Sequence, residues 1–249
     1  MSVINIVQYV KIGIKMSSGL ISFTTSQISN ESDQLGEDGK DGKTYLVKLK
    51  AAAKGNYGTQ TFSLRKNTEI AVKTFKPKKS TNKIQKEASY QSEAAAAGIS
   101  PTIYGVNLEE RYIVMQKLCS LPAKDYQGYE LPDRYQYQLC ALMGRLDSIG
   151  ILHGDMNALN VMLDTNERSY MIDFGFAKKI TAAVTRKHGQ HPNITVSLWG
   201  LIRGFQRYKV TTLIMNNCVE ACKNGEDISH WIQKGEEELT VTKKKRKRK

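Results

Sequence analysis

The segment HGDMNALNVMLD, residues 153–164, constrains the fold of this chain more than any other stretch. It places one histidine, one glycine, one aspartate and two asparagines directly before an apolar run. Asp155 and Asn160 are five residues apart, so a loop can present a carboxylate to a hydroxyl group and an amide oxygen to a metal ion. The apolar residues that follow predict a strand that holds this loop in place.

A second acidic segment follows a few residues later. The run YMIDFGFA, residues 170–177, ends an apolar strand pattern with an Asp-Phe-Gly triplet. The carboxylate of Asp173 suits a second Mg²⁺ ligand, because Mg²⁺ prefers oxygen donors. Together with Asp155 and Asn160 it indicates a site that handles phosphate and metal. We expect His153 to brace the loop and not to act as a base.

The residues before this site predict several strands and one helix. Residues 44–52 and 68–75 alternate apolar and polar side chains, which is typical of half-buried strands. The glycine-bearing stretch AKGNYGTQ between them predicts the turn of an antiparallel hairpin. Residues 81–97 predict a helix that begins after Ser80 and ends at Gly98. Two further strand-like runs, PTIYGVNL and RYIVMQKL, follow it.

The second half of the chain predicts mainly helices. Residues 131–150 show helical apolar spacing, and the run NITVSLWGLIRGF predicts a later helix with Trp199 and Phe205 in the core. Strands followed by helices favour an α+β fold in two lobes. We expect four parts, in chain order an N-terminal arm (1–29), a β-rich lobe (30–117), a reduced helical lobe (118–242) and a basic tail (243–249).

A lysine and a glutamate of the first half can form an ion pair. Lys73 lies in the strand pattern IAVKTF, and Glu87 lies in the helix predicted to follow. A glutamate on a helix packed over a strand can hold a lysine ammonium group against phosphate oxygens. Glu93 is the alternative partner for the same lysine.

Two glycine clusters could cover a phosphate group. The run LGEDGKDGKTYLV places Gly36, Gly39 and Gly42 just before a predicted strand. Glycine lets backbone N–H groups approach phosphate closely, because no Cβ atom intervenes. Gly55 and Gly58 compete for this role, and we favour the first cluster because it directly precedes the more regular strand.

In this order the motifs resemble those of the protein-kinase superfamily over about residues 30–210. The runs EIAVKTFKPKKSTNKIQKEASYQSEAAAAGISPTIYGV and HGDMNALNVMLDTNERSYMIDFGFAKKI are most similar to small atypical kinases. These include the compact kinase of the KEOPS tRNA-modification complex, the RIO type, and related kinases encoded by large DNA viruses. The resemblance implies a two-lobed kinase-like α+β fold with a β-rich N-lobe and a reduced helical C-lobe.

The resemblance also implies ATP and Mg²⁺ as cofactors and gives each motif a role. Lys73 would bind the α- and β-phosphates, and Glu87 would anchor it. Asp155 would be the catalytic base. The metal ligands would be Asn160 and Asp173, and adenine would be contacted at the gatekeeper Met115 and the hinge residues Gln116 to Leu118.

Three departures from the kinase pattern are informative. Asn157 stands where Ser/Thr kinases usually carry lysine, and Gly154 replaces the arginine of the usual HRD motif. No APE motif follows the DFG triplet. These departures predict a minimal kinase that is not switched by phosphorylation of residues 176–196, and that takes its positive charge from Lys73 and Mg²⁺.

We therefore expect ATP- and Mg²⁺-dependent transfer of the γ-phosphoryl group to Ser/Thr hydroxyls of protein substrates, with an activating protein partner as a further expectation. A small-molecule phosphotransferase of the aminoglycoside or sugar-kinase type is the alternative, because those enzymes share the HGDxxxxN pattern. A pseudokinase adaptor is disfavoured, because all five key polar positions are filled.

The charge is concentrated at one end of the chain. The net charge is +13, and residues 243–249 (KKKRKRK) are all basic. Such a tail is compatible with nuclear import, nucleic-acid binding or solubility. No run approaches the roughly 18–20 apolar residues of a membrane span. We expect an intracellular protein, cytoplasmic or nuclear, without a membrane partner.

Overall fold

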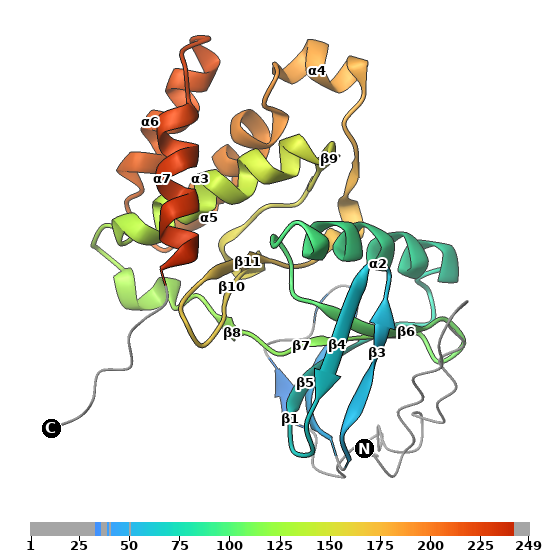
Figure 1. Cartoon of the computed structure of the whole chain (residues 1–249). Helices are drawn as coiled ribbons and strands as arrows, with labels where there is room; N and C mark the ends of the chain where they lie inside the picture. The colour runs from blue at the N-terminus through green and yellow to red at the C-terminus, as the bar shows by residue number, and fades with distance from the viewer. Residues whose placement is uncertain (1–32, 36–38, 40, 50, 242–249) are drawn as a thin grey trace, which may run out of the picture. The chain divides into compact units, whose positions relative to one another are not determined.

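The structure is a computed structural model of the whole chain, and it describes residues 33–35, 39, 41–49 and 51–241. The predicted N-terminal arm (1–29), Gly36 and the basic tail (243–249) lie outside the described residues. The chain divides into two compact units. Unit 1 comprises Met1–Ala96 and Pro101–Lys117, and unit 2 comprises Ala97–Ser100 and Leu118–Lys249. Each is described by itself below (Figure 1).

Unit 1 contains an antiparallel five-stranded sheet in the order β1-β2-β5-β7-β6. Strands β2 and β5 pair over their full length, from Gly42 opposite Phe75 to Lys48 opposite Glu69. The strands predicted from alternating side chains are therefore confirmed. Strand β1 (Asp33–Leu35) was not predicted. The other strands of the sheet are β2 (Gly42–Lys48), β5 (Glu69–Phe75), β6 (Ile103–Asn107) and β7 (Tyr112–Gln116).

The stretch AKGNYGTQ is not a simple turn, and this part of the sequence prediction is wrong. It forms β3 (Ala53–Tyr57) and the start of β4 (Gln60–Leu64). These two strands pair with each other as an additional hairpin, which is inserted between β2 and β5 in the sequence. The turn itself lies at Gly58, whose φ is +57°. A left-handed residue in a two-residue turn suits the twist of a hairpin, so the glycine closes β3 onto β4.

Strand β5 separates two apolar clusters of unit 1. Ile70 and Val72 face a cluster with β2 and β4 residues, whereas Ala71 and Phe75 face helix α2 (Thr81–Ala96). Successive side chains of a strand point to opposite faces. Lys73 shares its face with Ala71 and Phe75, so the strand pairing directs this lysine toward α2. The helix was predicted for residues 81–97, and its existence is confirmed.

Unit 2 is mainly helical, as predicted (Figure 1). The fully buried residues Leu139, Leu142, Met143 and Leu146 give its central helix α3 an apolar surface along its length. Helix α7 approaches α3 closely at Gly235, where a Cβ atom would lie 2.0 Å from the carbonyl oxygen of Tyr137. The helices are α3 (Asp133–Ser148), α4 (Ala182–His188), α5 (Trp199–Arg207), α6 (Leu213–Lys223) and α7 (Ser229–Thr240).

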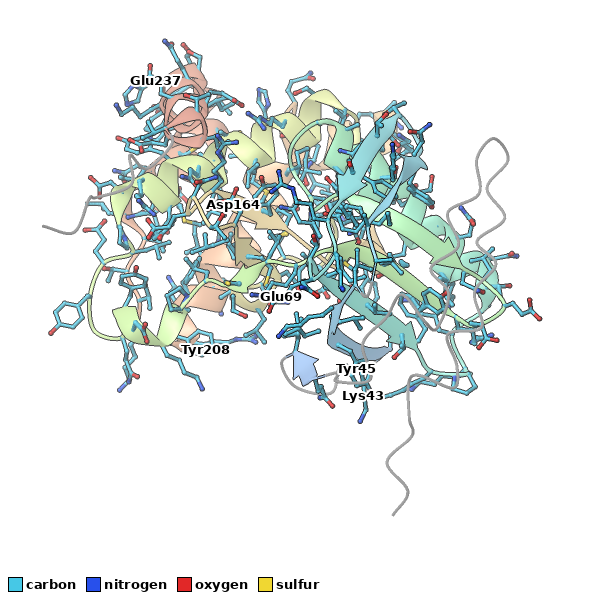
Figure 2. All side chains as sticks on the ribbon, turned by 60° about the horizontal axis from the view of Figure 1, so that its bottom comes forward. Lys43, Tyr45, Glu69, Asp164, Tyr208 and Glu237 are labelled. Atoms are coloured by element: carbon cyan, nitrogen blue, oxygen red, sulfur yellow. The ribbon has the colours of Figure 1, made fainter. Side chains whose placement is uncertain are left out.

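Short strands of unit 2 hold the polar loops in place. Strand β10 pairs with β8 and β11, and β9 pairs with β12. Asp164, labelled in Figure 2, closes the turn after β10 by accepting hydrogen bonds from the N–H groups of Asn166 and Arg168 at 2.7 and 3.0 Å. The bounds are β8 (Cys119–Ser120), β9 (Ile151–Leu152), β10 (Val161–Leu163), β11 (Ser169–Met171) and β12 (Lys178–Lys179).

The helix predicted from NITVSLWGLIRGF consists of a π-helical segment, η4 (Asn193–Leu198), that continues into α5. Phe205 is fully buried, as predicted, but the placement of Trp199 in the core is wrong, because 44% of it is exposed. Gly200 and Gly204 occupy the face that approaches the loop of residues 156–158. Trp199 therefore lies on another face, where the Arg203 guanidinium group lies 5.2 Å from its ring centroid.

Among the described residues, no helix has both the length and the apolar character that a membrane crossing requires.

Candidate active site

The Lys73 ammonium group pairs with Glu87 of α2, with 2.7 Å between Nζ and Oε1. The Glu87 side chain is fully buried, whereas Lys73 retains 16% side-chain exposure. A buried carboxylate is costly unless a cation neutralises it, so the pair restricts both side chains to one arrangement. Glu93, the alternative partner, lies on the exposed face of α2.

The structure describes two members of the favoured glycine cluster, Gly39 and Gly42. Gly42 begins β2, and a Cβ atom there would lie 1.8 Å from the carbonyl oxygen of Thr74, so the strand pairing requires glycine. Gly39 accepts a hydrogen bond from Lys76 Nζ at 2.9 Å. The competing glycines 55 and 58 belong to the β3–β4 hairpin instead.

The predicted adenine contacts begin at the end of β7. Met115 is buried, and its sulfur accepts a hydrogen bond from Gln91 Nε2 at 3.4 Å. The backbone N–H of Gln116 donates to the carbonyl oxygen of Thr102 at 2.9 Å, so the sheet already uses this donor. Leu118, the first residue of unit 2 after β7, is buried.

In unit 2, Asn160 and Asp155 are joined directly. Asn160 Nδ2 donates to the backbone carbonyl oxygen of Asp155 at 2.7 Å. The N–H of Ile172 donates to the carbonyl oxygen of Asn160 at 3.0 Å, which ties this loop to the residue before Asp173. The five-residue spacing therefore brings these two polar residues together through the backbone of Asp155.

Asp173 lies at a backbone position with φ +66° and ψ +71°, which is left-handed and uncommon for a residue with a side chain. Burial raises the pKa of the Asp155 carboxyl group above its usual value, and the negative charge of Asp173 raises it further. The two carboxylates thus create a region of negative potential within unit 2. A divalent cation would relieve this repulsion.

Comparison with known proteins identifies the family of this chain. The family model described as "Protein tyrosine and serine/threonine kinase" matches residues 34–200, more than half of the chain. The chain belongs to the protein-kinase superfamily.

Individual relatives are more distant. The chain is 33% identical, over 57% of its length, to the "Probable bifunctional tRNA threonylcarbamoyladenosine biosynthesis protein" of Methanosarcina acetivorans, and the match covers 22% of that protein. It is 23% identical, over 64% of its length, to "Serine/threonine-protein kinase rio2" of Dictyostelium discoideum, covering 30% of that protein. The matches thus span less than a third of these curated relatives.

Two departures of this kinase domain from the usual pattern have local structural causes. Asn157 Oδ1 accepts a hydrogen bond from the N–H of Leu159 at 2.9 Å and so caps the 3₁₀ turn η2 (Ala158–Asn160). Gly154 has a φ of +82°, and a Cβ atom there would lie 2.6 Å from the carbonyl oxygen of Phe176. The loop therefore uses these two positions to shape its own backbone.

The histidine of the kinase loop is fully buried. His153 Nε2 lies 3.0 Å from the carbonyl oxygen of Ile172, and the His153 ring lies 4.7 Å from the ring of Phe174 between centroids. These contacts join the HGD loop to the DFG segment. They agree with the expectation that His153 braces the loop.

One residue that supports this loop could not be anticipated from the sequence. Asn193 Oδ1 accepts a hydrogen bond from the backbone N–H of His153 at 3.2 Å. Asn193 Nδ2 donates to Asp147 Oδ1 and to the carbonyl oxygen of Ile151, each at 2.7 Å. The only sequence signal was a polar residue at the start of the apolar run that becomes η4 and α5. That signal alone indicates no partner.

Proposed function

We propose that this kinase domain transfers the γ-phosphoryl group of ATP to serine or threonine hydroxyls of protein substrates, with Mg²⁺ as the required metal. The observation that carries the proposal is the Asp155–Asn160 hydrogen bond. It ties the Asn160 amide to the backbone of Asp155, so that one short loop carries both a carboxylate that can accept a proton and an amide that can bind a metal.

Unit 1 supplies the nucleotide-binding groups in this proposal. Lys73, fixed by Glu87, would bind the α- and β-phosphates. The glycine cluster, of which the described members are Gly39 and Gly42, would cover the phosphates. Adenine would lie against Met115 and the backbone of residues 116–118, where Gln116 can offer its carbonyl group but not its N–H.

Asn160 and Asp173 of unit 2 suit Mg²⁺. Because Asn160 Nδ2 donates to the backbone of Asp155, the side-chain oxygen Oδ1 of Asn160 is the atom that can bind a cation. Asp173 adds a carboxylate, and Mg²⁺ is commonly bound by one or two carboxylates together with substrate phosphates. When bound, the metal would neutralise charge on the transferring phosphoryl group.

Asp155 would act as the base. As the acceptor hydroxyl oxygen forms its bond to the γ-phosphorus, the bond to the ADP oxygen breaks and the hydroxyl proton passes to the Asp155 carboxylate. Asn157 cannot supply the positive charge that lysine would give, because it is an amide that caps η2. Lys73 and Mg²⁺ would provide that charge.

The similarity to the rio2 kinase supports a Ser/Thr protein acceptor. The higher identity to a protein named for tRNA threonylcarbamoyladenosine biosynthesis supports a second candidate function. In that function the same site would use ATP within a tRNA-modification assembly that includes protein partners. Transfer to a small-molecule acceptor is a third candidate function, and an assay must distinguish it from the other two.

The test uses the full chain with γ-labelled ATP and Mg²⁺, alone and with generic protein, tRNA or small-molecule acceptors. Label on serine or threonine is expected. Asp155→Asn should reduce transfer by about 10²–10⁴-fold, the usual contribution of a general base. The control Asp125→Asn alters an exposed aspartate of η1 (Ala123–Tyr126) and should retain activity. Label only on small acceptors, or equal activity of the two variants, contradicts the proposal.

We also propose that the basic tail acts separately from catalysis, in nuclear import or nucleic-acid binding. Removal of residues 243–249 should leave phosphoryl transfer unchanged and reduce salt-sensitive nucleic-acid binding or nuclear localisation. Loss of transfer on deletion would contradict the separation of the two roles.

A further inference from the structure

The buried carboxylate of Glu87 binds two lysines. Its Oε1 atom lies 2.7 Å from Lys73 Nζ, and its Oε2 atom lies 2.6 Å from Lys79 Nζ. The Lys79 side chain is only 5% exposed, so it is more deeply buried than Lys73. Lys79 lies in the connection between β5 and α2, and no motif in the sequence singled it out.

Lys79 also reaches the glycine cluster. Its Nζ lies 2.9 Å from Asp41 Oδ2, directly before Gly42. The same ammonium group lies 4.8 Å from the centroid of the Phe75 ring. Burial of a lysine is costly unless carboxylates neutralise it, and here Glu87 and Asp41 both do so. The ammonium group therefore links a loop residue to a residue of α2.

The backbone around Lys79 is held independently of these ion pairs. The Arg111 guanidinium group donates to the carbonyl oxygens of Pro77, at 2.8 Å, and of Lys79. The N–H of Lys76 donates to the carbonyl oxygen of Asp41 at 2.9 Å. The connection is thus attached to the β6–β7 turn on one side and to the glycine cluster on the other.

We propose that Lys79 is a positioning residue for nucleotide binding. It couples the glycine loop, by which we mean the segment that carries Gly39, Asp41 and Gly42, to helix α2. The inference rests on the proposed function, in which this loop covers the ATP phosphates. Lys79 holds Asp41 and Glu87 in one arrangement before ATP arrives. Preorganisation of this kind improves affinity, because less conformational freedom is lost on binding. Lys79 contacts no phosphate in this scheme and acts through the two carboxylates.

The direction in which Asp41→Asn changes the affinity for ATP distinguishes a positioning role of Asp41 from a purely electrostatic effect of its charge. Removing a carboxylate from a loop that covers phosphates would, by charge alone, strengthen ATP binding. If Asp41 acts through Lys79, its removal releases the loop and weakens ATP binding instead. The two explanations therefore predict opposite changes in the KM for ATP.

The experiment measures kcat and the KM values for ATP and for a protein acceptor in the full chain. The variants are Asp41→Asn, Lys79→Gln, their double variant and the control Lys78→Gln, which alters an exposed neighbouring lysine. We expect Asp41→Asn and Lys79→Gln each to raise the KM for ATP by about 3–10-fold. The double variant should be no worse than the more affected single variant, because the two residues act through one contact. The acceptor KM and the control should change by less than about twofold.

A lower or unchanged KM for ATP in Asp41→Asn overturns the inference, as do effects that multiply in the double variant. Asp41 is partly exposed, so its variant decides the matter even if Lys79→Gln fails to fold. A wild-type chain that neither binds nor consumes ATP overturns the proposed function together with this inference. ATP-dependent turnover with an unaffected Asp41→Asn variant overturns the inference alone.

Discussion

Gly154 lies directly against the main chain of Phe176, so that a Cβ atom at position 154 would come within 2.6 Å of the Phe176 carbonyl oxygen. Its φ of +82° is also one that side chains disfavour. The arginine of the usual kinase motif could be placed here only if one of the two segments moved. The packing of the HGD loop against the segment after DFG therefore requires glycine at position 154.

This packing predicts the effect of Gly154→Ala. Gly128 has the same φ, +82°, but a Cβ atom there would meet nothing within 4 Å. Gly128→Ala should lower the free energy of unfolding by about 1–2 kcal/mol, from backbone strain alone. Gly154→Ala should cost a further ~1–3 kcal/mol from overpacking. Urea denaturation of both variants measures the difference, and equal losses would show that the Phe176 contact is not restrictive.

Asn193 and Asp147 can be tested as a pair. Asn193→Asp places a second carboxylate where an amide now donates to Asp147, so it should destabilise the fold by about 2–4 kcal/mol. The same variant should also lower kcat while changing the KM for ATP less, because Asn193 supports the backbone of His153. The double variant Asp147→Asn/Asn193→Asp restores one amide and one carboxylate and should regain part of both losses. Additive losses in denaturation and kinetics would contradict this pairing.

The buried carboxyl group of Asp147 predicts a dependence of stability on pH. Burial raises the pKa of Asp147 from its ordinary value of 3.8 to about 7, although hydrogen bonds from Asn193 and Ile194 oppose the rise. Between these two values the folded chain keeps the proton and the unfolded chain loses it. Stability therefore falls as pH rises from about 4 to about 7, and it levels off above 7, where both states have lost the proton.

Thermal unfolding between pH 5.5 and 8 measures this effect. The decrease in Tm over that interval should be larger in the wild type than in Asp147→Asn by roughly 2–6 °C. His191 Nδ1 lies 3.7 Å from Asp147 Oδ2, so His191→Gln is the control for a contribution from this contact. If His191→Gln removes the pH dependence and Asp147→Asn retains it, the assignment to Asp147 is wrong.

Gly235 should respond to alanine in the opposite sense to an ordinary helical glycine. Alanine usually stabilises a helix by about 1 kcal/mol relative to glycine. In α7 its Cβ atom would lie 2.0 Å from the carbonyl oxygen of Tyr137 and 2.6 Å from Cβ of Ala141. Gly235→Ala should therefore separate α7 from α3 and lower the free energy of unfolding by ~2–4 kcal/mol. A stabilised variant in chemical denaturation would show that the helices can move apart without cost.

Local patterns in the sequence were sufficient for much of the fold. The alternation in residues 68–75 predicted β5, the start and stop signals at Ser80 and Gly98 predicted α2, and helical apolar spacing predicted α3. The inserted β3–β4 hairpin was missed because glycines within strands and glycines within turns look alike in a sequence. The exposure of Trp199 was missed because the helical pattern does not say which face the small residues Gly200 and Gly204 will give to a neighbouring loop.

The sequence by itself determined the family and the chemical classes of the site residues, because motif spacing depends on short stretches of backbone. Tertiary structure decided which groups those residues contact. Glu87 pairs with Lys73 because the alternation of side chains along β5 directs Lys73 toward α2. Glu87 also pairs with Lys79 because the connection between β5 and α2 brings Lys79 back to the same carboxylate. Asn193 supports His153 across forty residues. Such contacts depend on how distant segments pack, which no local pattern of side chains specifies.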